Sequence, residues 1–583
     1  MKKRLLALLF ATTMAVTTVA GCGRLVETSP MVDVQSTTET VNSVTPSTHS
    51  KPSHTLSPIN EDAPAMKSDS GAYAADAEVE ASACYDGYYG TYSYDDFYEE
   101  PYSGETYDLI NESGFLSVSR NPLSTFGADV DTASYSNMRR FVNSGYGLYD
   151  FENVALRTEE LINYFNYNYK APKAGERFGV EATVSDCPWN KENKLLVLGI
   201  NTKTLTEGKR PDSNIVFLID VSGSMNSADK LPLLKDSMKL LVENLTSKDR
   251  VSIVTYASGT KVVLDSVPGD KTSKINKAFE NLKAGGSTNG EGGIELAYEI
   301  AEKNFIEGGN NRIILATDGD FNVGKHRGDE LKELITEKKE SGVFLSILGF
   351  GTGNYNDVTG ETLADSGNGN YSYIDCLTEA KKVLVDEMSS TLYTVAKDTK
   401  FQVEFNPEMV ASYRLIGYEN RALADEDFTD DTKDGGELGA GHQVTVIYEL
   451  ELAEDETKIA YPLKYTGNAK NAIKEKSFDE WCTLSIAYKD PDKDESQYLA
   501  FPVGNDNYTD LPSDNFILAT SVAEYAMALN GSEYLVDMTR EEAINQAIKN
   551  VKKLNADDEL VSEFLVLMEK VASNETSTGH WYD

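Results

Sequence analysis

One part of the chain repeatedly alternates a short apolar run with a helical pattern, and this alternation constrains the fold more than any other feature. Residues 215–219 are all apolar, as expected for a strand buried on both faces. Apolar residues then recur at spacings of three and four over 231–245, which predicts an amphipathic helix. The alternation continues with strands predicted at 251–256, 261–267, 312–316, 343–348 and 371–374, and with helices at 275–282, 294–305, 329–339 and 379–392. This pattern predicts an α/β fold with a doubly wound, mostly parallel sheet.

Polar residues follow two of these strands and precede one of the helices. The first strand ends in Asp220, with Ser222 and Ser224 after it, and a later strand is followed by Asp318. Thr288 lies in a glycine-rich loop before a helix. Open α/β sheets bind ligands beyond the carboxyl ends of their strands, so we expect these side chains to converge. Carboxylate and hydroxyl oxygens suit a divalent cation such as Mg²⁺, Mn²⁺ or Ca²⁺, with Mg²⁺ preferred, and do not suit Zn²⁺ or Cu²⁺.

In type, order and position on the loops, these five residues resemble the metal-ion-dependent adhesion site of the von Willebrand factor A domain. The resemblance covers about 214–392 and is specific, because the D-x-S-x-S, G-S-T and T-D-G motifs occur together with the strand and helix alternation. It implies a Rossmann-like A domain at 213–393. It also implies that the five residues ligate the cation and that the domain binds protein partners through it.

Further segments resemble a bacterial subfamily in which A-domain lipoproteins carry a dedicated segment on each side of the domain. These segments are 121–126, 129–135, 159–165, 350–357 and 413–420. In that subfamily the C-terminal segment has no assigned function. The resemblance therefore extends over nearly everything after Ser113 but supplies no known partner.

The two flanks, 115–212 and 394–583, show period-two alternation that is typical of strands. The candidate strands are 178–184, 195–200, 401–405, 443–451 and 482–488. We expect both flanks to form one β-rich domain in which the A domain is inserted. From Ser513 the pattern becomes helical, and Thr539 with Glu542 forms a capping box at a helix start.

The N-terminus resembles an export signal. Three basic residues precede a short apolar run, and residues 1–21 are too short and too polar at their end for a membrane-spanning helix. Small residues then precede Cys22, as in a bacterial lipobox. An ordinary signal peptide with a chance cysteine is the alternative. We expect Cys22 to be lipidated, which would anchor the protein to the extracytoplasmic face of the bacterial membrane.

Residues 22–114 have the composition of a tether. Serine, threonine and acidic residues dominate this segment, and its 85–108 part holds eight tyrosines and seven carboxylates without a basic residue. Such a segment buries too little apolar surface to offset its chain entropy, so we expect it to be disordered. A sticky segment that contacts the cell wall or a partner is the alternative. As a coil it would span roughly 50 Å.

Charge and cysteine content exclude several classes. The 583-residue chain has a net charge of −40, which argues against nucleic acid as a partner and leaves the lipid anchor as the membrane contact. Five cysteines are too few for a disulfide scaffold. Pairing among Cys84, Cys187, Cys376 and Cys482 stays open.

The sequence thus favours a binding protein over an enzyme. Two carboxylates balance the charge of the cation, and an Asp or Glu from a protein partner can complete its shell. No general base with a clear partner is visible beside the predicted site. A structural envelope protein with a stabilising metal is one alternative, and a metal-dependent hydrolase is another.

Overall fold

The computed structural model describes residues 111–128, 131–154, 156–205, 210–287, 290–319, 328–352, 357–433, 435–453, 479–491, 493, 495–554 and 558–574. The predicted signal peptide, Cys22, Cys84 and almost all of the predicted tether lie outside the described residues. None of the helices within these ranges combines the length and the apolar character that a membrane crossing requires.

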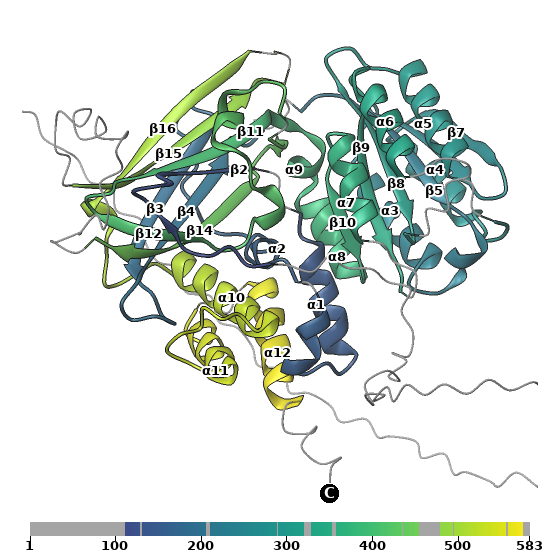
Figure 1. Ribbon diagram of the computed structural model, residues 1–583. Helices are drawn as coiled ribbons and strands as arrows, with labels where there is room; N and C mark the ends of the chain where they lie inside the picture. Colours follow the sequence, from purple (N-terminus) through teal and green to yellow (C-terminus); the bar gives the residue numbers. More distant parts are fainter. Residues whose placement is uncertain are drawn as a thin grey trace, which may run out of the picture. The chain divides into compact units, whose positions relative to one another are not determined.

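Six strands form the predicted doubly wound sheet, in the order β10-β9-β8-β5-β6-β7. Every neighbouring pair is parallel except β6 and β7, which are antiparallel. The strands are β5 (Ser213–Asp220), β6 (Arg250–Tyr256), β7 (Thr260–Pro268), β8 (Asn310–Thr317), β9 (Phe344–Phe350) and β10 (Tyr371–Ile374). Figure 1 shows this sheet in teal, with helices on both of its faces.

The central strand β5 serves two apolar cores, because successive side chains point to opposite faces. Ile215, Phe217 and Ile219 pack on one face with α3, α4 and α8, whereas Val216 and Leu218 pack on the other with α5, α6 and α7. The helices are α3 (Leu231–Val242), α4 (Thr272–Glu280), α5 (Glu291–Lys303), α6 (Gly328–Lys339), α7 (Asp357–Ser366), α8 (Leu377–Lys381) and α9 (Met388–Leu392). We call residues 213–392 the inserted unit.

The helix predicted at 379–392 is not continuous. Its first part is α8, its last part is α9, and a π-helical turn at Lys382–Asp386 lies between them. The amide of Glu387 donates to the carbonyl of Lys382, five residues back, at 2.8 Å. One extra residue is thereby accommodated while Val383 and Leu384 remain buried in the core of the inserted unit.

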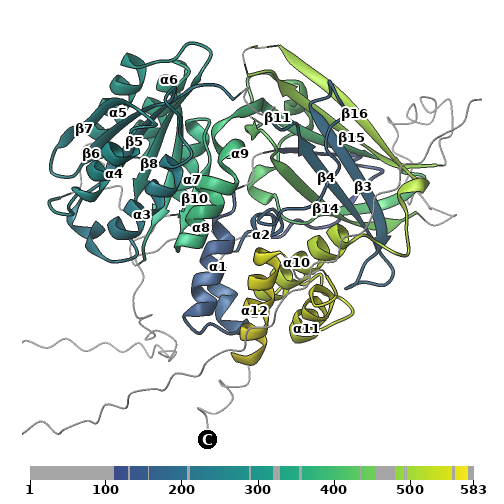
Figure 2. The same cartoon turned by 180° about the vertical axis from the view of Figure 1, so that it is seen from behind.

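The two flanks form one β-rich domain, as predicted. One antiparallel sheet has the order β1-β12-β14-β4-β3, and a second has the order β13-β11-β15-β16, with β2 paired to β11. The strands are β1 (Leu116–Ser117), β2 (Leu123–Gly127), β3 (Phe178–Asp186), β4 (Lys194–Thr202), β11 (Thr394–Phe405), β12 (Val410–Leu415), β13 (Leu438–Gly439), β14 (Gln443–Leu452), β15 (Glu480–Lys489) and β16 (Ser496–Gly504). In Figure 2 the blue strands of the first flank lie among the green strands of the second. The inserted unit lies in the chain between β4 and β11.

Helices from both ends of the chain share a third apolar core. They are α1 (Ala133–Asn143), α2 (Thr158–Ile162), α10 (Asp514–Asn530), α11 (Arg540–Val551) and α12 (Glu559–Asn574). The predicted capping box is confirmed, because Thr539 Oγ1 accepts from the amide of Glu542 and Glu542 Oε2 accepts from the amide of Thr539.

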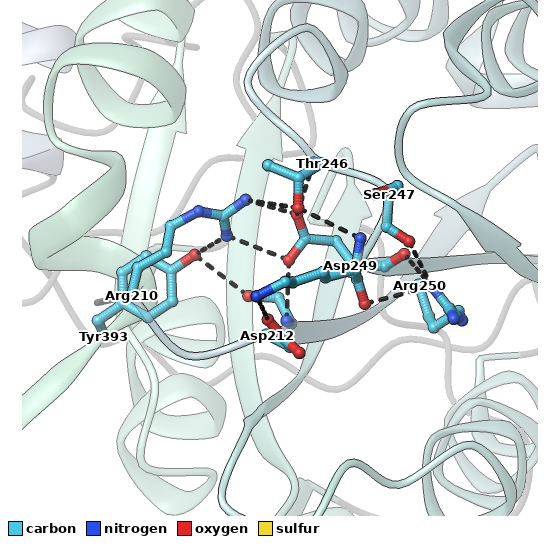
Figure 3. Close-up of polar contacts among 9 residues, drawn as sticks. Arg210, Asp212, Thr246, Ser247, Asp249, Arg250 and Tyr393 are labelled. Carbon is cyan, nitrogen blue, oxygen red and sulfur yellow. Dashed lines mark hydrogen bonds and ion pairs between the residues drawn. The ribbon is translucent and has the colours of Figure 1, made fainter. Parts of the chain in front are cut away.

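The two connections of the inserted unit meet at Asp249, just before β6 (Figure 3). Arg210 in the incoming connection donates to both carboxylate oxygens of Asp249, and it also donates to the hydroxyl of Tyr393 in the outgoing connection. The amides of Ser213 and Thr246 donate to the same carboxylate, at 2.9 and 2.6 Å. Burial alone would raise the pKa of Asp249, but these hydrogen bonds hold it below its ordinary value.

Candidate functional site

Asp220 is the last residue of β5 and is fully buried. Its Oδ1 accepts a hydrogen bond from the amide of Ser222 at 2.7 Å, which turns the loop back toward the strand end. Its Oδ2 is also buried, and within the described residues it has no hydrogen-bond partner. A buried carboxylate oxygen without a partner is unfavourable, so this atom indicates a position that a cation would complete.

The two serines of the motif lie on the loop directly after β5. Ser222 is buried and Ser224 is exposed, with 2.9 Å between their hydroxyl oxygens. The amide of Gly223 donates to the carbonyl of Gly286 at 3.0 Å. This contact brings the glycine-rich loop that leads to Thr288 against the first loop. Thr288 itself lies outside the described residues.

Asp318 follows the last residue of β8 and is fully buried. Since β5 and β8 are parallel neighbours, with Ile219 opposite Ala316, Asp220 and Asp318 lie at the same edge of the sheet. Asp318 Oδ2 accepts a hydrogen bond from Lys230 Nζ at 3.0 Å, and the lysine side chain is only 7% exposed.

The two carboxylates influence each other electrostatically. Burial is the main cause that raises the pKa of Asp220 to about 6, and the negative charge of Asp318 adds to it. Hydrogen bonds from Ser222 act in the opposite direction, and so does the nearby buried hydroxyl of Tyr256. In the absence of a cation, the site therefore disfavours ionisation of both carboxylates. A bound divalent ion would remove this penalty, because its positive charge stabilises both ionised groups.

The oxygen donors at this edge fit a hard divalent cation. Asp220, Ser222 and Asp318 supply carboxylate and hydroxyl oxygens, and Ser224 is hydrogen-bonded to Ser222. Within the ranges that the structure describes, no group of three or more His, Cys, Asp or Glu side chains could hold a metal ion. A metal at this edge would accordingly need hydroxyl ligands besides the two carboxylates.

Sequence reasoning missed Lys230 as a member of this site. It directly precedes helix α3, where a lysine would ordinarily be solvated. No local pattern relates it to Asp318, because 88 residues separate them. A sequence signal that could have drawn attention to it is the glycine at 351, whose missing side chain leaves room for the lysine stem.

Asp131, in the segment 129–135, has a structural role. Asp131 Oδ1 accepts from the amide of Tyr371 at 2.9 Å, and its Oδ2 lies 3.3 Å from an Arg421 nitrogen. Cys187, Cys376 and Cys482 are free thiols, so no disulfide joins the cysteines that the structure describes.

Three family profiles match the chain, one after another. Residues 101–197 match the family described as "von Willebrand factor", and residues 214–384 match "von Willebrand factor type A domain". Residues 390–573 match "Uncharacterized protein YfbK, C-terminal". The three matches follow the order of first flank, inserted unit and second flank.

Similar proteins occur in bacteria. The chain is 44% identical over 436 residues to the Escherichia coli (strain K12) protein YfbK, and this similarity covers 74% of the chain and 75% of YfbK. It is 30% identical over 187 residues to the Synechocystis protein sll0103, covering 32% of the chain and 43% of that protein. A solved structure, "von Willebrand factor type A from Catenulispora acidiphila", is 14% identical with a TM-score of 0.37, over 67% of this chain and 88% of that one.

Proposed function

We propose that this protein, which belongs to the YfbK family of von Willebrand factor type A domain proteins, binds a protein partner through a divalent cation at the carboxyl edge of its parallel sheet. The observation that supports this most is the buried Oδ2 of Asp220, which lacks a hydrogen-bond partner among the described residues. Asp220 lies at the same sheet edge as Asp318, which follows the neighbouring strand β8.

Asp220, Ser222, Ser224, Thr288 and Asp318 would hold the cation, with Mg²⁺ as the preferred ion and Mn²⁺ or Ca²⁺ as alternatives. A bound Mg²⁺ ion supplies a positive charge and takes six oxygen ligands. Serine and threonine hydroxyls carry no charge, so the protein neutralises the ion with two carboxylates only. An Asp or Glu carboxylate from the partner therefore gains a charge-assisted contact at a position that the protein leaves to solvent.

The position of the domain outside the cytoplasmic membrane belongs to the same proposal. Lipidated Cys22 would anchor the chain on the extracytoplasmic face. The acidic segment at 22–114 would then act as the flexible tether between the membrane and the folded part. In this position, the carboxyl edge of the parallel sheet with its proposed metal site (the metal edge) would be accessible to other proteins of the envelope or the surroundings.

Calorimetric titration with Mg²⁺ and Mn²⁺ tests the metal site. We expect the full chain to bind one ion and Asp220→Ala to lose most of the affinity, since one carboxylate cannot balance a charge of +2. Ser222→Ala should lose less, because water can replace a neutral hydroxyl. Asp236→Ala, an exposed carboxylate on α3, is the matched control and should bind like wild type. Unchanged affinity in an Asp220→Ala protein with a native circular dichroism spectrum contradicts the assignment.

A pull-down in the presence and absence of a chelator separates adhesion from a purely structural role. If the metal mediates contact, partners captured from an envelope extract should be lost with chelator and restored by Mg²⁺. Partners retained equally by Asp220→Ala and wild type would instead favour a structural envelope protein whose metal only stabilises the loops.

A further inference from the structure

Lys230 is a buried cation at the metal edge to which no role has been assigned above. Its side chain is 7% exposed, and its Nζ donates to Asp318 Oδ2 at 3.0 Å. Asp318 is fully buried, so both ends of this ion pair are largely removed from water. Lysine is rarely buried unless it has a charged partner, and here the partner is one of the two carboxylates expected to hold the metal.

The fold holds Lys230 in this position. Its carbonyl accepts the first hydrogen bond of helix α3, from the amide of Leu234 at 2.8 Å, and its own amide donates to Ser227 at 3.2 Å. The aliphatic stem passes over Gly351, which has φ of +79°. A Cβ atom at 351 would overlap the stem, so the glycine supplies the space along which the lysine reaches the sheet edge.

The ion pair between Lys230 and Asp318 changes the net charge at this edge of the sheet. A buried carboxylate without a counter-charge is strongly unfavourable. Lys230 supplies that counter-charge to Asp318, whereas Asp220 Oδ2 has no partner within the described part of the chain. Without a metal the three groups sum to a charge of −1, and with a divalent cation they would sum to +1.

Building on the function proposed above, we propose that Lys230 is a resident counter-ion that competes with the divalent cation for Asp318, so that loading of the site displaces its ammonium group. The ammonium group and a metal ion would both draw on the lone pairs of the Asp318 carboxylate. They also repel each other in a site from which water is largely excluded. Lys230 therefore lowers the affinity for the metal. Its charge also gives the metal-loaded site a net positive charge, which attracts a carboxylate of the partner.

Calorimetric titration of the full chain with Mg²⁺ and Mn²⁺ tests this competition. We expect Lys230→Met to bind the ion roughly tenfold more tightly than wild type, or better, because the metal no longer has to replace an ammonium. Lys230→Gln should shift in the same direction by less, since its amide can still donate to Asp318. Lys239→Met removes a charge from α3, the helix that follows Lys230, at a more exposed position and should bind like wild type.

If a folded Lys230→Met protein binds the ion no more tightly than wild type, the competition is overturned. The proposed function still stands in that case, provided that wild type binds the ion and Asp220→Ala does not. If wild type itself binds neither ion, the proposed function fails first. Should both Lys230 variants misfold, amine acylation of wild type followed by mass spectrometry decides the matter. Labelling of Lys230 should then rise at saturating Mg²⁺ while that of Lys239 stays constant, and unchanged labelling of Lys230 overturns the proposal.

Discussion

Arg139 of α1 and Glu379 of α8 form a buried ion pair, with 2.7 Å between Nη2 and Oε2 and 240 residues between them in the sequence. The same guanidinium donates to Asp375, and Tyr164 donates to the same oxygen of Glu379. Arg139 thus joins the first flank to the C-terminal end of the inserted unit, through charges that are at most 10% exposed.

Replacement of Arg139 by methionine should destabilise the protein strongly, because it leaves two buried carboxylates without their counter-charge. We expect the free energy of unfolding to fall by about 3–5 kcal/mol. Guanidinium chloride titration followed by tryptophan fluorescence measures this change. Arg120→Met, at an exposed position, is the control and should change stability by less than about 0.5 kcal/mol. Similar midpoints for the two variants would show that the buried pair contributes little.

The contact between Arg210 and Asp249 should be energetically coupled. A double-mutant cycle with Arg210→Met, Asp249→Asn and the double variant should give a coupling energy of about 1–3 kcal/mol, because Asp249 is buried and also binds two backbone amides. The exposed pair Lys303 and Asp265 is the matched control, for which a coupling below about 1 kcal/mol is expected. Equal coupling energies in the two cycles would contradict a special role for the Asp249 contact.

Glu524 should make stability depend on pH. Burial in α10 raises the pKa of its carboxyl from 4.5 to about 8, although Gln546 donates a hydrogen bond to it at 2.9 Å. The unfolded chain releases this proton near its ordinary pKa, whereas the folded chain keeps it until about pH 8. The folded state binds more protons in this window, so its stability falls as the pH rises through it and stays lower above it.

Glu524→Gln removes this titration. Its free energy of unfolding should exceed that of wild type at about pH 9, by up to about 5 kcal/mol, and should match wild type at about pH 4. Urea titrations at both pH values measure the difference. Glu295→Gln, on the exposed side of α5, should show no such change between the two. A Glu524→Gln variant that gains equally at both pH values would refute the titration as the cause.

The lipid anchor can be tested by fractionation. Cys22→Ser removes the sulfur that lipidation requires, so the protein should move from the membrane fraction to the soluble or secreted fraction. Cys376→Ser changes one of the thiols of the folded part and should leave the protein in the membrane fraction. Retention of the Cys22→Ser protein on membranes would mean that another feature attaches it.

Much of the inserted unit is predictable, because burial on both faces leaves a strong signal. The run 215–219 lies inside β5, and the strand predicted at 371–374 coincides with β10. Continuous apolar runs of this length have few alternatives in an α/β sheet. Two of the motif residues also lie at neighbouring strand ends, since Asp220 is the last residue of β5 and Asp318 follows the last residue of the parallel strand β8.

Features that depend on tertiary contacts escape sequence reasoning. The π-helical turn at 382–386 interrupts a periodic pattern that predicts one regular helix. In the sequence, Arg139 within a helix and Lys230 just before one look like ordinary charged surface residues. Each is nevertheless buried against a carboxylate far away in the chain. Spacing reveals neighbours within one element, whereas such pairs are created only when elements from different parts of the sequence pack together.

The place where both connections meet Asp249 also determines how a mechanical load would pass through the inserted unit. Asp220 ends β5 at one edge of the sheet, and Ser213, bound to Asp249, begins it at the other, roughly 25 Å away along the strand. Tension applied at the Asp220 edge would run along β5. Through Arg210 and Tyr393 it would then be shared between the incoming and the outgoing connection of the inserted unit. The hydrogen bonds of parallel strands would then be sheared together rather than opened one after another, which is the stiffer of the two directions in which a sheet can be pulled.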